Sequence, residues 1–197
     1  MKNEIIRSQL IYEGWSTLHR YTIDVSKDSQ LSVPVHREIY DSGNGAAVLL
    51  YNSSKRRVIL TRQFRLAAKL NGHDSGYIIE ACAGLLDDMD PVEAIKKEIL
   101  EETGLAVRKV KKIMESYASP GAHKEKIWLF TAEYSDSDKI EKGGGLSEEH
   151  EEIEVLEFTY KEIFDLYNAG KFEDSKTIIL IQYAILKGLI SGSEQIL

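Results

Sequence analysis

Apolar residues over most of the chain fall in short segments separated by turn residues, a pattern typical of β-strands. Three such segments precede a turn signal at Asn44-Gly45. The next two are joined through the polar residues 52–57, which predicts a β-hairpin. The predicted strands cover residues 4–12, 16–25, 31–40, 46–51, 58–64, 76–83, 107–117, 126–134 and 153–158.

Residues 90–104 show the apolar period of an α-helix instead. Asp90 is a suitable N-cap, Pro91 fits the first helical position, and Glu93 stands where a capping-box acid reaches back to the cap. Gly104 supplies the stop. The side chains predicted to face the protein interior are Val92, Ile95, Ile99, Leu100 and Thr103.

Two more helices are predicted after the last strand. Residues 159–169 are amphipathic and are followed by Gly170, whereas residues 175–189 are more uniformly apolar. The polar residues 69–75 predict a loop. Because strands alternate with the three helices, the sequence predicts an α/β fold class.

The composition is that of an ordinary globular protein, with 43% hydrophobic and 29% charged residues among 197. The formal net charge of −7 argues against a nucleic-acid or membrane surface, because binding to a nucleic-acid backbone needs a basic face. The single cysteine, Cys82, excludes an internal disulfide framework. Without an apolar leader or a run of transmembrane length, we expect a protein of the reducing cytoplasm.

Three glutamates crowd the second half of the helix predicted at 90–104. Glu98 and Glu102 are four residues apart and share one face at the edge of the apolar arc. Lys97 lies nearer to Glu101 than to this pair. A solvated acidic face is the simpler interpretation, but carboxylates that border a buried arc repel each other. They favour a hard cation such as Mg²⁺ or Mn²⁺.

The same stretch resembles the motif of the Nudix hydrolases, G-x5-E-x7-R-E-U-x-E-E-x-G-U, in which U is a bulky aliphatic residue. Lys97 stands where the family has arginine. The N-terminal part of this stretch departs from the motif, because Gly84 is one residue too close to the helix and Met89 takes the place of the early glutamate. We interpret this as a one-residue deletion in the preceding loop. The positions that match in order are Glu98, Ile99, Glu101, Glu102 and Gly104.

The resemblance implies a fold and an assembly. It predicts an α/β/α sandwich around a mixed β-sheet, with an N-terminal β-rich subdomain at residues 1–43 and the Nudix domain at residues 44–197. In related members this subdomain reaches across a two-fold axis, which predicts a homodimer with N-terminal exchange. Trp15, Arg37 and Glu38 are then candidates for binding the base or ribose. An exposed aromatic and a cross-strand ion pair explain these residues equally well.

The resemblance also implies Mg²⁺ as the cofactor, with Mn²⁺ as the alternative. Glu98, Glu102 and the backbone carbonyl of Ala83 are the expected metal ligands, and both glutamates are expected catalytic residues. Residues 143–158 read GGGLSEEHEEIEVLEF. The three glycines and the acidic run that follows them predict a flexible lid before the strand at 153–158. From this lid Glu151 is expected as a further ligand and as the catalytic base. Its rivals for that role are Glu149 and Glu152.

Charged residues outside the helix are candidates for substrate contact. Arg65, at the end of a predicted strand, resembles the substrate arginine of the family and can offer a planar fork to a diphosphate. Lys176 stands in the first turn of a helix, where the dipole disfavours a cation unless an anion lies nearby. That anion is either the substrate or one of the acids Asp174 and Glu173. Glu125 is the last candidate for substrate contact.

Two further residues keep two interpretations each. Arg62 is assigned either to a diphosphate or to a salt bridge with the helix 90–104 or with Glu80. Glu80, which points from the strand predicted at 76–83, is open between a functional and a structural role.

Several segments narrow the resemblance to family members that hydrolyse GDP-mannose, namely RQFR, AGLLD, SPG, GGG and DSKT. This implies Mg-dependent hydrolysis of the diphosphate bond of a nucleotide sugar, giving GMP and mannose 1-phosphate. Pro120, sixteen residues after Gly104, favours the alternative of an ADP-ribose pyrophosphatase. A non-catalytic domain that binds a nucleotide sugar is the second alternative. The presence of all three helix acids argues against it.

Overall fold

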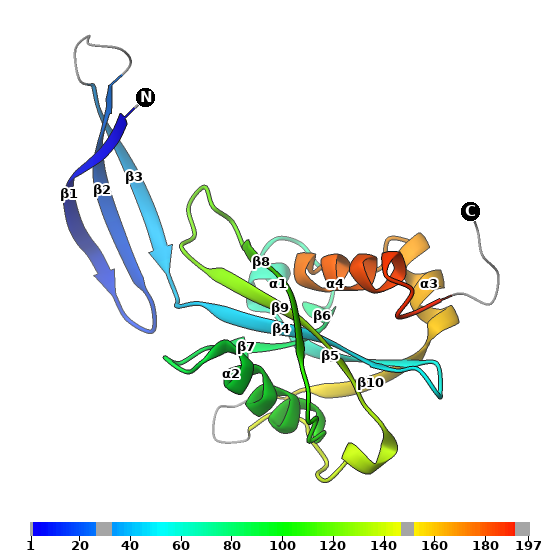
Figure 1. Ribbon diagram of the computed structural model, residues 1–197. Coiled ribbons are helices and arrows are strands. Elements are labelled where there is room, and N and C mark those ends of the chain that lie inside the picture. Colours follow the sequence, from blue (N-terminus) through cyan, green and yellow to red (C-terminus); the bar gives the residue numbers. More distant parts are fainter. Residues whose placement is uncertain (1, 27–32, 147–151, 192–197) are drawn as a thin grey trace. The chain divides into compact units, whose positions relative to one another are not determined.

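The computed structural model describes residues 2–26, 33–146 and 152–191 (Figure 1). The chain forms two compact units. The N-terminal unit comprises Met1–Gly45 and Glu115–Ile127, and the larger unit comprises Ala46–Met114 and Trp128–Leu197. The predicted division at residues 43 and 44 stays a prediction.

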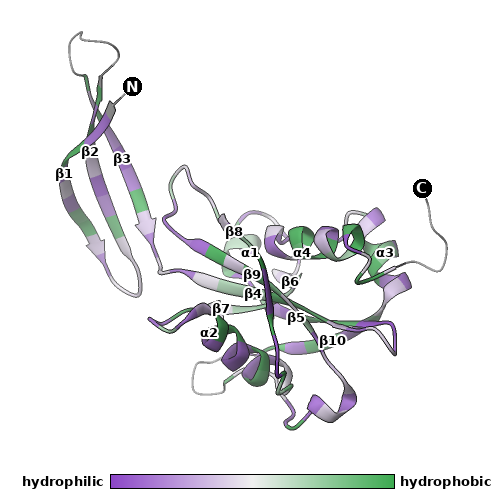
Figure 2. Ribbon diagram, in the orientation of Figure 1, coloured by the Kyte–Doolittle hydropathy of each residue, from purple (hydrophilic) through white to green (hydrophobic). Residues whose placement is uncertain are grey.

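The N-terminal unit carries an antiparallel sheet in the order β1-β2-β3. Its register shifts between Ile5 and Arg7 and again between Leu10 and Tyr12, so bulges interrupt the alternation of β1. The side chains of residues 3–13 are all exposed, and hydrophobic segments along these strands are visible in Figure 2. The strands span Lys2–Glu13 (β1), Thr17–Ser26 (β2) and Val33–Asp41 (β3), near the predicted ranges.

A second sheet has seven strands, in the order β10-β5-β4-β9-β8, with β6 beside β5 and β7 beside β4. The single strand predicted at 76–83 is wrong, because the chain breaks at Ala81 and its two halves pair with different neighbours. The strands are Gly45–Asn52 (β4), Arg57–Phe64 (β5), Tyr77–Glu80 (β6), Cys82–Leu85 (β7), Lys111–Tyr117 (β8), Lys126–Glu133 (β9) and Glu154–Thr159 (β10).

The helices lie on both sides of this sheet, with α2 on one side and α4 on the other (Figure 1). One of them, α1, occupies part of the predicted loop. None of its residues is buried, so the sequence has no apolar period that would predict this helix. No helix in the described ranges is long and apolar enough to cross a membrane. The helices are Leu66–Leu70 (α1), Pro91–Glu98 (α2), Tyr160–Asn168 (α3) and Ser175–Leu186 (α4), with a π-helical turn at Ile99–Thr103 (η1) and a 3₁₀ turn at Asp136–Asp138 (η2).

The central strand β4 explains why both faces are covered. Its residues 45–50 are all buried, which is typical of a strand between two layers. Val48 and Leu50 pack in one cluster with Ile95 of α2 and Ile99 of η1. Strand alternation places Leu49 on the opposite face, toward the side on which α4 lies. The arrangement is the predicted α/β/α sandwich, and it fixes α2 firmly against the sheet.

Candidate functional site

The acidic helix begins as the sequence predicts. Asp90 is the N-cap, and its side chain accepts a hydrogen bond of 2.9 Å from the backbone N–H of Val92. Pro91 occupies the first helical position. The capping box is wrong, since Glu93 pairs with Lys96 at 3.2 Å.

The loop before the helix closes with a tight turn. The backbone N–H of Met89 donates to the carbonyl of Leu86 at 2.8 Å, and the two residues between them, Asp87 and Asp88, have φ of 46° and 64°. Two successive positive φ angles are typical of a type I′ turn, and aspartate tolerates them better than most residues. This turn brings the loop, one residue shorter than the family motif, to the helix start.

The last turn of the helix is π-helical, which changes where its acids point. The wider turn makes the 100° spacing used for the prediction inaccurate beyond Glu98. Ile99 and Thr103 are fully buried, as predicted, but Glu102 is also buried, with 2% of its surface exposed. Glu101 stays partly exposed and pairs with Lys97 at 3.1 Å, as the sequence indicated. The turn therefore directs Glu102 into the protein and leaves Glu101 outside.

Glu98 lies against strand β7. A Cβ atom on Gly84 would stand 2.1 Å from Cδ of Glu98 and 2.3 Å from its Oε1, so any larger residue would displace the carboxylate. Gly84 directly follows Ala83, whose carbonyl is the predicted metal ligand. The motif glycine thus leaves the space that the Glu98 carboxylate occupies.

Glu102 of η1 lies beside Cys82, which is the first residue of strand β7. Burial, followed by the negative charge of Glu102, raises the pKa of the Cys82 thiol well above its usual range, and a hydrogen bond to Glu102 contributes. The thiol therefore stays protonated next to the carboxylate. Its proximity to both Glu102 and Glu98 was not foreseen, because the sequence predicted only a small buried residue.

The chemistry of this donor set fits a hard divalent cation. Two glutamate carboxylates reach strand β7, one against Gly84 and one beside Cys82, and all candidate ligands are oxygen atoms. Within the described ranges no three His, Cys, Asp or Glu side chains form a ready metal cluster. The predicted third acid, Glu151, lies outside the described residues, as does its rival Glu149, whereas Glu152 is exposed.

The glycine segment is bonded to the end of the acidic helix. The N–H groups of Gly144 and Gly145 donate to the carbonyls of Glu102 and Glu101 at 2.8 and 3.1 Å. A Cβ on Gly143 would lie 2.5 Å from the carbonyl carbon of Thr103. The prediction of a flexible lid is therefore wrong for these three glycines, which allow close backbone packing instead.

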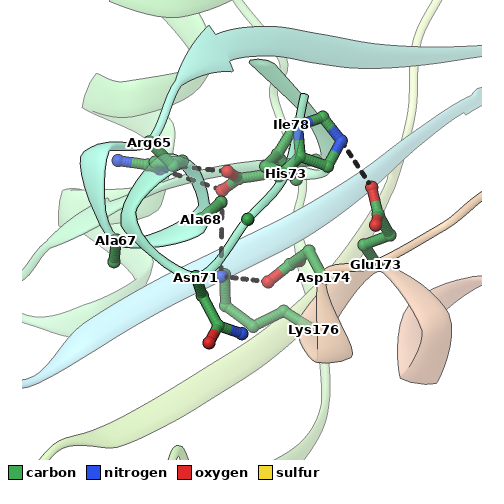
Figure 3. A pocket seen from close by; sticks show the side chains of 11 residues that line it. Arg65, Ala67, Ala68, Asn71, His73, Ile78, Glu173, Asp174 and Lys176 are labelled. Atoms are coloured by element: carbon green, nitrogen blue, oxygen red, sulfur yellow. Dashed lines mark hydrogen bonds and ion pairs between the residues drawn. The ribbon is translucent and has the colours of Figure 1, made fainter. Parts of the chain in front are cut away.

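A pocket of about 680 Å³ lies between the end of β5, the loop after α1 and the start of α4 (Figure 3). Both predicted phosphate-binding cations, Arg65 and Lys176, line it. Figure 3 shows the His73 and Glu173 side chains meeting beside the pocket, and their ion pair measures 3.1 Å. The lining residues are Arg65, Ala67, Ala68, Asn71, Gly72, His73, Ile78, Glu80, Glu173, Asp174 and Lys176.

Arg65 is held by a buried carboxylate. Its Nε and Nη2 donate to Oε1 and Oε2 of Glu80 at 2.7 and 2.9 Å. Burial opposes the charge, but these bonds and the negative charges of Glu80, Glu102 and Asp174 raise the pKa of the guanidinium. Glu102 of the acidic helix is thus among the negative charges that act on Arg65.

Lys176, in the first turn of α4, forms an ion pair with Asp174. Its Nζ lies 2.6 Å from Oδ1 of Asp174, which confirms the ion pair that the sequence allowed. Burial disfavours the Asp174 carboxylate, but Lys176 and the hydrogen bonds from Lys176 and Thr177 prevail and lower its pKa. Asp174 is also the N-cap of α4. Lys176 is thus held at the mouth of the pocket.

The remaining candidates lie in the N-terminal unit. Trp15 is 79% exposed, which agrees with both interpretations of it. Glu38 pairs across the strands with Arg20 at 2.7 Å, and Arg37 donates to the carbonyl of His36. Glu125 lies 3.3 Å from the ring Nδ1 of His123. The structure therefore brings Arg65 and Lys176 together with each other but leaves these four residues in the other unit.

Arg62 pairs with the exposed Glu154 and not with Glu80 or the acidic helix, its two expected protein partners.

The sequence leaves the role of Glu80 open, whereas the structure makes Glu80 the shared partner of Arg65 and Lys176. The signal for Glu80 was its place in the strand YIIE, where alternation puts it on the same face as buried Ile78. A carboxylate at an inward position requires a partner.

Residues 41–179 match the family described as NUDIX domain. The chain is similar to curated proteins named GDP-mannose pyrophosphatase. Identity is 46% over 185 residues with that of Pectobacterium atrosepticum, covering 94% of this chain and 95% of the relative. It is 46% with that of Cronobacter sakazakii, covering 95% and 97%, and 43% with that of Escherichia coli O157:H7, covering 94% and 96%.

The fold is similar to a solved ADP compounds hydrolase. The TM-score is 0.73 over 96% of both chains, while the sequence identity is 18%. At this identity the likeness concerns the fold alone. It confirms the predicted α/β architecture over nearly the whole length.

Proposed function

This chain belongs to the Nudix family, as its sequence predicted, and from that membership we propose that it hydrolyses GDP-mannose to GMP and mannose 1-phosphate. The proposal is supported by relatives of that name that match this chain nearly from end to end. One observation carries it in the structure: Arg65 and Lys176 line one pocket, in the same unit as the acidic helix.

Nudix pyrophosphatases use divalent metal ions, and we propose Mg²⁺ for this one, with Mn²⁺ as the alternative. Glu98, Glu102 and the carbonyl of Ala83 would hold it, joined by Glu151. When bound, it supplies positive charge that neutralises the diphosphate and makes an attacking water easier to deprotonate. The oxygen-only donor set suits either ion.

Side chains of the protein bind the substrate and accept the proton of the attacking water. Arg65 and Lys176 bind the non-bridging oxygens of the diphosphate and orient it. Glu151 takes the proton of the water that attacks one phosphorus. The bond between that phosphorus and the bridging oxygen breaks, and each product leaves with one phosphate. Glu102 is itself shielded from bulk water.

The N-terminal unit completes the proposal. Apolar side chains of β1, among them Ile6 and Leu10, are 58% and 45% exposed, and such surface marks an interaction site. We propose that a second copy of the chain covers it, in a homodimer with N-terminal exchange. Trp15, Arg37 and Glu38 would then contact the base or ribose, and Glu125 would contact the substrate.

The direct test is turnover by the purified chain. GDP-mannose in excess Mg²⁺ should yield equimolar GMP and mannose 1-phosphate, and a chelator should stop the reaction. Binding of GDP-mannose without either product, in Mg²⁺ or Mn²⁺, would contradict the proposal and favour a non-catalytic binding domain.

A further inference from the structure

Glu80 occupies an unusual position for a carboxylate, because it is buried beneath two cations. Its side chain is 4% exposed, whereas that of Arg65 is 43% exposed. Both carboxylate oxygens accept from Arg65, at 2.7 and 2.9 Å, and Lys176 Nζ lies 3.9 Å from the second oxygen. Figure 3 marks the contacts of Arg65 and Lys176 with dashed lines. Glu80 therefore lines the pocket as a buried carboxylate, and the guanidinium of Arg65 is the more exposed partner of the pair.

The two bonds leave Arg65 able to bind a ligand. An arginine has five N–H donors, and the fork to Glu80 uses the Nε side of the group. The donors on the outer edge remain available, and the fork fixes the plane in which they lie. Glu80 thus determines the direction in which Arg65 presents its donors.

Lys176 is joined to the same residue through a ring of contacts. Nζ of Lys176 binds Asp174, whose other oxygen accepts from the Thr177 hydroxyl at 2.7 Å. The Thr177 hydroxyl in turn accepts from the N–H of Ala81 at 2.6 Å. Because Ala81 follows Glu80 in the chain, the ring closes. It ties the start of α4 to the junction of β6 and β7, next to the predicted metal carbonyl.

The neighbouring pair of Arg62 on β5 and Glu154 on β10 shows what an ordinary surface contact looks like here. Arg62 and Glu154 are 47% and 51% exposed, and each could be replaced with little consequence. Burying Glu80 instead carries a desolvation cost that a hydrophobic residue would avoid. Fixed geometry of the two cations is the function that this cost supports.

We propose that Glu80 is a positioning residue for the reaction: it orients Arg65 and sets the distance from Arg65 to Lys176, so that both meet one diphosphate. This role rests on the proposed function. Glu80 itself touches no substrate; it acts through the two cations.

A double-mutant cycle tests this role. Glu80→Gln keeps the shape of the side chain but removes its charge, and should lower kcat/KM at least about tenfold. Arg65→Ala should lower it further. In the Arg65→Ala background, Glu80→Gln should lower kcat/KM clearly less than it does in the wild type, because Arg65 is gone and only the 3.9 Å contact with Lys176 remains. Multiplicative losses would overturn the inference, since they would mean that Glu80 acts independently of Arg65.

A second variant keeps the test decisive if Glu80→Gln fails to fold. Arg65→Lys leaves Glu80 a cationic partner but cannot form two parallel bonds, so it should lower kcat/KM as Glu80→Gln does. Wild-type kcat/KM in Arg65→Lys would overturn the inference. Glu154→Gln is the matched control on the exposed pair and should keep wild-type kinetics.

The wild type is assayed first, so that the two failures are distinguishable. If it does not turn over GDP-mannose, the proposed function and this inference both fall. If it turns over GDP-mannose but the cycle is multiplicative, the inference alone falls.

Discussion

At the scale of single residues, the proposed metal site depends on a buried carboxylate. Glu102 is 2% exposed and lies beside the protonated thiol of Cys82. Replacing it by glutamine keeps the shape and removes a buried negative charge. We expect Glu102→Gln to lose at least about 10³-fold in kcat without a lower melting temperature, in assays with saturating Mg²⁺.

The neighbouring acid provides the control for that substitution. Glu101 pairs with Lys97 on the outer side of the helix, so Glu101→Gln should retain most of its activity. Near-native turnover by Glu102→Gln would remove the metal assignment of Glu102.

The glycine before the acidic helix can be tested in the same way. In Gly84→Ala the new Cβ would meet the end of the Glu98 side chain, which can rotate away at small cost to the fold. We expect kcat to fall at least about tenfold, with a higher Mg²⁺ requirement and little change in melting temperature. Gly121→Ala is the control, because a Cβ there meets nothing within 4 Å. Equal kinetics in the two variants would contradict the placement of Glu98.

At the scale of elements, the acidic helix ends in a close backbone contact. Gly104 has φ of 71°, and a Cβ on it would stand 2.1 Å from the carbonyl oxygen of Glu141. Gly104→Ala should therefore cost about 2 kcal/mol or more of unfolding free energy, measured in urea. Gly170→Ala is the control, with φ of 64° and open space around the new atom, and should cost about 1 kcal/mol. Equal costs would show that steric contact is not the cause.

The start of α4 links stability to pH. The pKa of Asp174 is lowered, so its contribution is fully present above its ordinary value of 3.8 and is lost as the pH falls through the lowered value. Asp174→Ala should lose about 1 kcal/mol of unfolding free energy at pH 7 through the missing N-cap. Its stability should then fall less steeply below about pH 4 than that of the wild type. Parallel acid profiles would contradict the ion pair with Lys176.

Elements governed by local chemistry were predictable from the sequence. The cap Asp90, the buried Ile95 and Ile99, and the pairing of Lys97 with Glu101 all follow from spacing along one helix. The π-helical turn and the break at Ala81 were not, because tertiary contacts decide them. For the same reason the sequence indicated Arg65 and Lys176 separately, while their shared partner Glu80 appears only in the fold.

At the scale of the whole molecule, the exposed apolar side chains of the N-terminal sheet predict self-association. The wild type should sediment as a dimer at micromolar concentration, and Leu10→Glu should shift it toward monomer by placing a charge on the covered face. Leu186→Glu is the control: Leu186 is 83% exposed on α4, so the dimer should persist. A monomeric wild type would remove both the exchange and the substrate roles of Trp15, Arg37 and Glu38.

The identity of the substrate can be tested by comparing two candidates. Wild-type protein in Mg²⁺ is given GDP-mannose and ADP-ribose separately, each with a chelator control, and the products are quantified by chromatography. We predict a kcat/KM for GMP formation at least about tenfold above that for AMP formation, with neither product formed when the chelator is present. Faster release of AMP would contradict it and would support the ADP-ribose alternative that Pro120 suggested.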